Sequence, residues 1–331
     1  MVYVPLSTDA LNKARTEQSS EKGDPVKGGS MEGSSAKDSP QAATMADAPC
    51  PIPRLDCGMF RTTDIRSWKN PEHVTIGEVP FKMPSSFPPT VLLGISKIDV
   101  NILRLKAEVR TVADDRAIIN MSTWANTKHY LSGCSWLTIL PDDPDIQSGR
   151  YNTAQDHHWS TSQKKTSRRI TFARSYATPP KVVVWLDAID SGPGRNARVT
   201  AWADQVTVDG FVIHLDTWLD SNLWSAGATW LAHSANRTDV RSGSFEVSDV
   251  RPPSAPRLTN RGRVAWGAPA MARPPRVFAA INMLDFQDGR SIRLKLETSE
   301  ITTTGMSWNL DSWADSIFHQ AGAVYVAFID G

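Results

Sequence analysis

The chain has 331 residues, of which 40% are apolar and 21% charged, and its formal net charge is +1. This length and composition are typical of soluble globular protein with room for two or three domains. A charge so near neutrality gives no general attraction to nucleic acid or to an anionic membrane, so we expect neither as a partner. The three cysteines are Cys50, Cys57 and Cys134, so the later two thirds of the chain cannot depend on disulfides.

The N-terminal segment, residues 1–50, is rich in Ser, Lys, Glu, Asp, Gly and Pro and nearly free of aromatic residues. Such a composition cannot bury enough apolar surface to offset the entropy of chain ordering, so we predict a disordered tail. The sequence has neither a signal-peptide pattern nor an apolar stretch of membrane-spanning length. We therefore expect a cytoplasmic protein without membrane insertion, and unconventional secretion stays open.

From residue 51 onward, short apolar and β-branched runs alternate with Gly, Pro, Asn and Asp, which is typical of an all-β sandwich or barrel. Three of these runs have strand length and follow a pair of prolines, from which a stiff turn leads into a buried strand. They begin at Val91, Val182 and Val277, after Pro88-Pro89, Pro179-Pro180 and Pro274-Pro275.

A pattern of aromatic residues and glycine occurs three times. A Trp is followed nine positions later by Gly and twelve positions later by a second aromatic residue, in Trp124–Gly133–Trp136, Trp218–Gly227–Trp230 and Trp313–Gly322–Tyr325. An Arg preceding each pattern keeps the same period of about 95 residues. A repeat of that length is large enough to be a small β-domain. We predict three units, at residues 51–141, 142–237 and 238–331.

The best-preserved set of these motifs lies in the first unit: Pro88-Pro89, Ile98-Asp99-Val100, Leu103-Arg104, Thr123–Lys128, Tyr130 and Ser135-Trp136. Together they resemble the H-type lectin domain, the fold of snail agglutinins and of the C-terminal part of discoidins. The resemblance implies a six-stranded antiparallel β-sandwich that binds N-acetylgalactosamine or galactose and assembles as trimers. Shallow sugar sites would lie at the protomer borders. For this chain it implies three tandem sandwiches, closed into an intramolecular pseudo-trimer or joined in a further homo-oligomer.

The same resemblance implies a sugar site lined by an Arg, a Trp and a Tyr. These residue types suit a pyranose, because an aromatic ring covers its apolar face and charged groups bind its rim of hydroxyls. The matching positions are Arg104, Trp124 and Tyr130 in the first unit, Arg198, Trp218 and Trp224 in the second, and Arg293, Trp313 and His319 in the third. We expect glycans or glycoproteins as partners, cell adhesion as a setting, and more than one binding site per chain.

Two departures from the family pattern favour an alternative. Relatives carry His directly after the Trp, where this chain has Ala125, Leu219 and Ala314. The acidic residue that the family uses from the loop after the first strand has no certain match, although Asp64, Asp156 and Asp249 lie in that region. The alternative is a non-catalytic scaffold for protein–protein contact that has lost sugar recognition.

The candidate residues also have structural interpretations. The first Trp of each pattern either contacts ligand or belongs to the core, and the second aromatic residue is expected in the core. Arg104 could instead pair with Asp99, which closes the preceding strand of its own unit. Asp99, Asp190 and Asp285 are interpreted as turn or capping groups.

Catalytic and metal-binding chemistry have little support in the sequence. His157 and His158 stand beside Asp156, but adjacent side chains of a strand point to opposite faces and no third ligand follows at useful spacing. No phosphate-binding glycine loop, nucleophile elbow or paired-cysteine motif occurs. We expect neither an enzyme nor a bound cofactor or metal.

Overall fold

The structure is a computed structural model that describes residues 55–82, 87–140 and 143–329. The predicted tail, residues 1–50, and part of the turn between the first two units lie outside the described residues. No helix among the described residues is long and apolar enough to span a membrane.

Each unit contributes six strands, and a single 3-10 turn follows the first of them. The first unit has β1 (Leu55–Arg61), β2 (Val74–Pro80), β3 (Thr90–Val100), β4 (Arg104–Val112), β5 (Arg116–Ser122) and β6 (His129–Ile139). The second has β7 (Ile146–Asn152), β8 (Lys165–Thr171), β9 (Lys181–Ser191), β10 (Ala197–Thr207), β11 (Gly210–Asp216) and β12 (Leu223–His233). The third has β13 (Val240–Glu246), β14 (Arg261–Ala265), β15 (Arg276–Phe286), β16 (Ile292–Ser299), β17 (Gly305–Asp311) and β18 (Phe318–Phe328).

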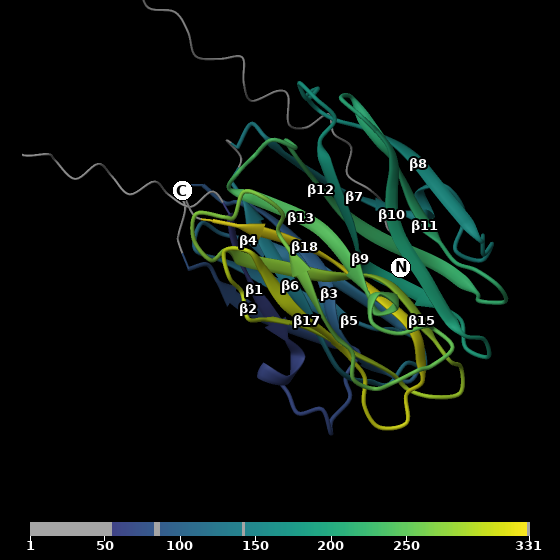
Figure 1. Cartoon of the computed structure of the whole chain (residues 1–331). Coiled ribbons are helices and arrows are strands. Elements are labelled where there is room, and N and C mark those ends of the chain that lie inside the picture. Colours follow the sequence, from purple (N-terminus) through teal and green to yellow (C-terminus); the bar gives the residue numbers. More distant parts are fainter. Residues whose placement is uncertain (1–54, 83–86, 141–142, 330–331) are drawn as a thin grey trace, which may run out of the picture. The chain divides into compact units, whose positions relative to one another are not determined.

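The strands form three antiparallel six-stranded sheets, and every sheet takes three strands from each of two units. Sheet A has the order β1-β6-β3-β16-β17-β14 and joins the first unit to the third. Sheet B, β2-β5-β4-β9-β12-β7, joins the first to the second, and sheet C, β13-β18-β15-β10-β11-β8, joins the second to the third. The units are therefore connected cyclically, as in an intramolecular pseudo-trimer. In Figure 1 the blue strand β3 accordingly lies among the green and yellow strands of the third unit.

The strand that follows each proline pair is central to this arrangement. β3, β9 and β15 start directly after Pro88-Pro89, Pro179-Pro180 and Pro274-Pro275, one residue earlier than the apolar runs predicted. Each of them pairs on one side with the last strand of its own unit and on the other with a strand of a neighbouring unit. Because the cross-unit pairing uses backbone hydrogen bonds, the units are fused through their sheets as well as through side-chain packing.

The axis between the three units is filled asymmetrically. Trp185 on β9 is fully buried and donates its indole N–H to the carbonyl of Leu93, 2.9 Å away. The corresponding positions on β3 and β15 are Gly94 and Ala280. A Cβ added to Gly94 would lie 2.3 Å from the Cβ of Ala280 and 2.6 Å from the ring of Trp185. One large side chain therefore occupies the space left by two small ones, and the three repeats cannot exchange places without a clash or a void.

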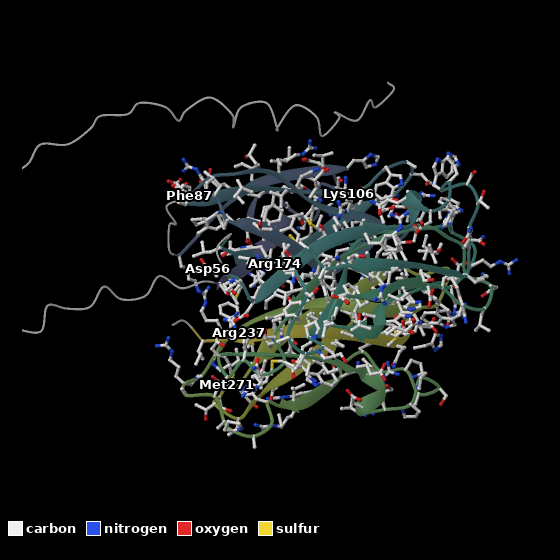
Figure 2. The ribbon with its side chains drawn as sticks, turned by 90° about the horizontal axis from the view of Figure 1, so that it is seen from above. Asp56, Phe87, Lys106, Arg174, Arg237 and Met271 are labelled. Atoms are coloured by element: carbon white, nitrogen blue, oxygen red, sulfur yellow. The ribbon has the colours of Figure 1, made fainter. Side chains whose placement is uncertain are left out.

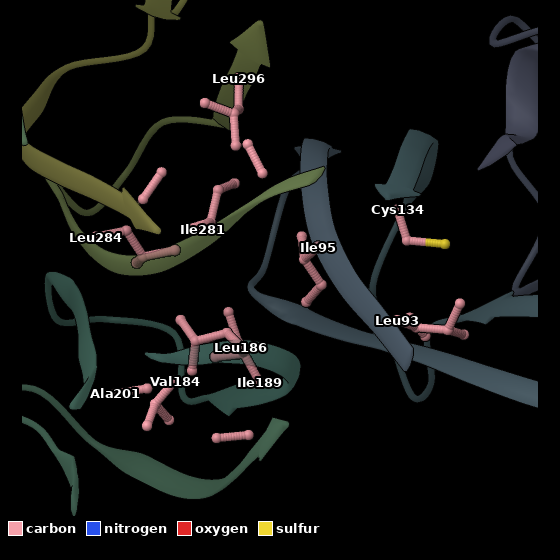
Figure 3. Close-up of a cluster of buried hydrophobic side chains, with 14 of the residues drawn as sticks. Leu93, Ile95, Cys134, Val184, Leu186, Ile189, Ala201, Ile281, Leu284 and Leu296 are labelled. Atoms are coloured by element: carbon pink, nitrogen blue, oxygen red, sulfur yellow. The ribbon is translucent and has the colours of Figure 1, made fainter. Parts of the chain in front are cut away.

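The cores of the sandwiches continue from this axis. Figure 3 shows Ile95, Leu186 and Ile281, one from each unit, among the buried apolar side chains of this cluster. The second aromatic residue of each repeated pattern is buried as predicted: Trp136, Trp230 and Tyr325 are 3%, 6% and 6% exposed. The glycine near the start of each unit makes room for it, since a Cβ on Gly58 would lie 2.5 Å from the Trp136 ring.

Charged side chains lie around one end of the strands, where Figure 2 labels Asp56, Arg174 and Arg237. Arg276 of the third unit pairs with Asp56 of the first, and Arg237 pairs with Asp143, whose carboxylate lies 3.0 Å away. The first of these ion pairs connects two units, and the second joins the two ends of the second unit.

Candidate functional site

Three arginines occupy equivalent positions where one unit meets the next. In each shared sheet the Arg lies directly across from an Asp of the neighbouring unit. The pairs are Arg104–Asp190, Arg198–Asp285 and Arg293–Asp99, with guanidinium–carboxylate distances of 3.4, 3.1 and 3.3 Å. We name these places the first–second, second–third and third–first borders.

This pairing corrects two interpretations from the sequence. Arg104 does not pair with Asp99 of its own unit, because Asp99 is the partner of Arg293. The three aspartates are also not turn or capping groups, since they lie within β3, β9 and β15. In each unit the Asp lies at the end of one strand and the Arg at the start of the next. These two strands belong to different sheets, so the Asp and the Arg of one unit do not pair with each other.

The Trp of the repeated pattern comes from the same unit as the Arg and is half-buried beside it. The indole N–H of Trp124 donates to Asp190, with a nitrogen–oxygen distance of 3.2 Å. The indole of Trp313 donates to Asp99 in the same manner at the third–first border. At these two borders the Asp therefore contacts both the Arg and the Trp of the neighbouring unit.

A third polar group binds each Arg from the residue two positions after the Trp. Arg104 donates to Asn126 at 2.6 Å, Arg198 to Asp220 at 2.8 Å and Arg293 to Asp315 at 2.6 Å. The Arg198 and Arg293 guanidinium groups hold the pKa of Asp220 and of Asp315 below the usual range. Each Arg is thus oriented between an acidic residue of the next unit and a polar side chain of its own loop.

The loop reaches this geometry through backbone strain. The residue between the Trp and the polar group adopts a left-handed conformation in all three repeats, with φ of 55° at Ala125, 53° at Leu219 and 56° at Ala314. Non-glycine residues at such φ values cost on the order of 1 kcal/mol each. The family resemblance predicts a His at these three positions. The chain has the same loop conformation in every repeat but lacks a side-chain hydrogen-bond donor there.

The predicted aromatic residue of each set does not join the Arg and Trp of its own unit. Instead it faces the border with the preceding neighbour in the cycle. Trp224 of the second unit lies over Arg104 of the first, with 5.0 Å from the guanidinium carbon to the ring centroid. Tyr130 of the first unit lines a groove with Arg293 and Trp313 of the third. The grouping of Arg104, Trp124 and Tyr130 in one site was therefore wrong, because successive strands carry them to different borders.

His319 takes the corresponding position at the second–third border. It is half-buried on β18, next to Gln320, the partner of Asp285 in the strand register. In the structure the set at this border is therefore Arg198 and Trp218 with His319, and at the first–second border it is Arg104 and Trp124 with Trp224.

The third–first border contains an open groove. A groove with a volume of about 810 Å³ is lined by side chains of β3, β6, β16, β17 and the loops beside them. Its walls include the exposed Trp68, Tyr130 and Trp313 as aromatic groups and Lys97, Arg293 and Lys295 as cations. This size falls in the range of small-ligand sites.

Burial perturbs the carboxylates of Asp99 and Asp190. Desolvation raises the pKa of Asp99 and of Asp190, and the attraction of Arg293 and of Arg104, respectively, opposes that shift. The net direction is upward in both cases. Each Asp thus depends on its Arg to stay ionised in a partly dry environment.

A second arginine supports the aromatic side of two borders from behind. Arg66 donates to the carbonyls of Tyr130 and His129, at 3.0 and 2.8 Å. Arg251 makes the equivalent contacts to the carbonyls of His319 and Phe318, both at 3.0 Å. These bonds fix the start of β6 and of β18, where the aromatic side chain of the border is attached.

Two of the three loop carboxylates considered as possible ligands, Asp156 and Asp249, make local contacts. Asp156 pairs with Arg168 and accepts a hydrogen bond from Tyr151. The Asp249 carboxylate accepts from the backbone N–H of Glu246 and caps the short 3-10 turn. In the described part of the chain, no cluster of three or more His, Cys, Asp or Glu side chains is arranged to hold a metal.

The fold and these borders define an all-β protein of three fused repeats with an arginine–aromatic site at each junction. The sequence matches the H-type lectin domain at residues 77–139, 167–233 and 270–328, which together exceed half of the chain, and the protein belongs to this family. Membership in a lectin family suggests that the chain binds carbohydrate.

A second similarity is more limited in extent. The chain is 33% identical over 70 residues to "ATP synthase subunits region ORF 7" of Fuscovulum blasticum. The match covers 21% of this chain and 61% of that protein.

The sequence interpretation missed the residues that connect the units. Asn126, Asp220 and Asp315 follow the Trp at the same spacing in each repeat, and this regularity was a usable signal. Asp99, Asp190 and Asp285 were identified, but their role across a border depends on the exchange of strands between sheets. Nothing in the local pattern shows which unit an edge strand will join.

Proposed function

We propose that the chain is a multivalent lectin for galactose- or N-acetylgalactosamine-type glycans, with its sugar sites at the three borders between units. The observation that carries this proposal is the recurrence of one polar frame at all three borders. In each, an Arg is held between an Asp of the next unit and a polar side chain of its own loop. No catalytic step is part of the proposal.

The chemistry of the frame fits a pyranose ring. The Tyr130 and Trp313 rings offer apolar surface to the face of the sugar, while Arg293 and the polar groups around it offer hydrogen bonds to its hydroxyls. Galactose and glucose differ in the orientation of one hydroxyl, and a site with fixed donors can discriminate between them. Fixed spacing of three sites on one rigid body raises the avidity for branched or clustered glycans.

Isothermal titration calorimetry of the full chain with galactose, N-acetylgalactosamine and glucose tests this function. We expect roughly millimolar affinity for a single galactose-type sugar and weaker binding of glucose. Tyr130→Ala should remove binding at the third–first border and reduce the measured stoichiometry, with an unchanged circular-dichroism spectrum. Trp202→Ala is the matched control, because Trp202 is an exposed aromatic residue on sheet C that is no part of the border frame. A chain that binds no glycan on a broad array would refute the lectin function.

A second candidate function is a protein–protein scaffold, and the first–second border favours it. Arg104 is only 5% exposed there, and Asp190, Asn126 and the Trp224 ring surround its guanidinium group. An Arg so enclosed has little surface left for a sugar hydroxyl. An intact fold without glycan binding at any border would support this function over the first.

A further inference from the structure

One row of facing residues on the outer side of sheet A is strongly basic. Arg61 on β1 faces Gly133 on β6, which faces Lys97 on β3, which faces Lys295 on β16. The next residue in the row is Asp311 on β17. These side chains share one face, because a Cβ on Gly133 would lie 3.4 Å from the Cβ of Lys97 and 3.7 Å from the Cγ of Arg61.

Like charges directly opposite each other in a sheet are destabilising, so this arrangement has a cost. Lys295 is neutralised by Glu297, 2.9 Å away. Among the described residues, by contrast, no carboxylate lies within ion-pair distance of the Lys97 ammonium group. Partial burial and the neighbouring Lys295 and Arg61 lower the pKa of Lys97, and the more distant carboxylates of Glu297 and Asp99 offset only part of that effect.

Lys97 and Lys295 also belong to the wall of the groove at the third–first border. Two acidic residues line the same groove, and both are already engaged. Asp99 binds Arg293 and the Trp313 indole, and Asp311 accepts from the backbone N–H of Asn260 at 2.9 Å. Within the groove, the Lys97 ammonium is therefore the charge left to bind a ligand.

The equivalent rows of the other two sheets have different charges. In sheet B the row is Asn152, Gly227, Ala188, Lys106 and Ser122, with a single cation. In sheet C it is Glu246, Gly322, Met283, Thr200 and Asp216, with two carboxylates. All three rows therefore have a glycine at the second position, whereas two adjacent lysines occur only in the row of sheet A.

We propose that the groove at the third–first border binds a glycan with an anionic substituent, a sulfate or a carboxylate, and that Lys97 is the residue that selects it. This inference rests on the proposed sugar binding and extends it to one of the three borders. The ring of the sugar occupies the aromatic part of the groove, and its anionic group lies over Gly133, where the absent side chain leaves room between Lys97 and Arg61. A sulfate or carboxylate there supplies the counter-charge that the protein lacks.

The test is calorimetry of the full chain with three ligands: lactose, lactose carrying a sulfate on galactose, and sialyllactose, which carries a carboxylate. We expect at least one anionic ligand to bind about tenfold more tightly than lactose at 50 mM NaCl, and the advantage to shrink as salt increases. The two anionic arms show whether the groove takes sulfate, carboxylate or both.

Lys97→Ala should remove the advantage of the anionic ligand, so that the variant binds the anionic ligand no more tightly than it binds lactose. Lys106→Ala is the matched control, since Lys106 stands in the equivalent row of sheet B and is labelled in Figure 2. An anionic preference that survives in Lys97→Ala, or equal affinity for all three ligands, overturns this inference while the lectin function stands. Failure to bind any of the three ligands overturns both.

Discussion

The third–first and first–second borders have the same frame and opposite surroundings. Both hold an Arg between a neighbouring Asp and a loop side chain, and in both a Trp donates to that Asp. At the first–second border the large ring of Trp224 covers Arg104. At the third–first border the smaller Tyr130 lines a groove, and Lys97 stands where sheet B has Ala188.

This difference separates what joins the units from what gives each border its chemistry. The Arg–Asp pair recurs at every border, so it belongs to the joining of the sheets as much as to any ligand site. The residues around it vary freely, because a side chain on the outer face of a sheet changes the charge and shape of the border at little cost to the core. Fusion of three repeats in one chain allows such divergence, which identical subunits of a homotrimer cannot have.

The largest expected effect comes from the axis that all borders share. Trp185→Ala removes the side chain that fills the space beside Gly94 and Ala280 and should reduce the free energy of unfolding by about 3–5 kcal/mol. Because every sheet includes strands of two units, we expect one cooperative transition in urea, with no border outlasting the others. Trp202→Ala, on the outer face, should cost less than about 1 kcal/mol. Separate transitions for the three units would show that the borders are independent of the axis.

The second prediction concerns a histidine at a position where the other two borders have apolar residues. His129 directly precedes Tyr130, and the matching positions in the other units are Leu223 and Phe318. Its ring is buried, with Nδ1 donating to the carbonyl of Glu72 at 3.0 Å and Nε2 accepting from Ser132 at 2.7 Å. Burial, helped by the charge of Arg66, lowers the pKa of His129 to about 4.

The folded state therefore keeps His129 neutral while the unfolded chain protonates it below pH 6.5. Its stabilising effect is complete above pH 6.5 and is lost as the pH falls toward 4, by roughly 3 kcal/mol in total. His233, whose pKa burial also lowers to about 4, adds to the same loss. Urea unfolding at pH 7.5, 6, 5 and 4.5 should show a smaller decline for His129→Leu than for the parent chain. Parallel declines would mean that His129 is protonated in the folded state.

The sequence predicted the elements of this comparison better than their arrangement. The chain repeats its proline pairs, glycines and aromatic residues with a period of about 95 residues. This repetition was sufficient to predict three copies of one β-fold. Buried positions such as Trp136 followed from the same pattern, because core side chains are constrained by packing.

The composition of each border could not be predicted in the same way. Arg104 and Tyr130 are near each other in the sequence, yet β4 joins sheet B and β6 joins sheet A. Which strands pair across units depends on contacts between residues about 90 positions apart, such as Arg104 with Asp190. The charge difference between the rows became visible only once the strand register placed Lys97 opposite Lys295.

Trp224→Tyr is expected to have the smallest effect on stability. It is also the most direct way to make the first–second border resemble the third–first border. The substitution gives the first–second border the aromatic residue of the third–first border. It should change the free energy of unfolding by no more than about 1 kcal/mol, because Trp224 is only half-buried and the replacement keeps an aromatic ring. Uncovering Arg104 should add a galactose-binding component in calorimetry, for which the parent chain is the reference. Trp224→Phe separates the loss of ring area from the gain of a hydroxyl. If neither variant gains sugar binding while the fold is intact, the ring of Trp224 is not what prevents binding at this border. The cause would then lie in the loop at Ala125, where the backbone is strained and the His expected from the family resemblance is absent.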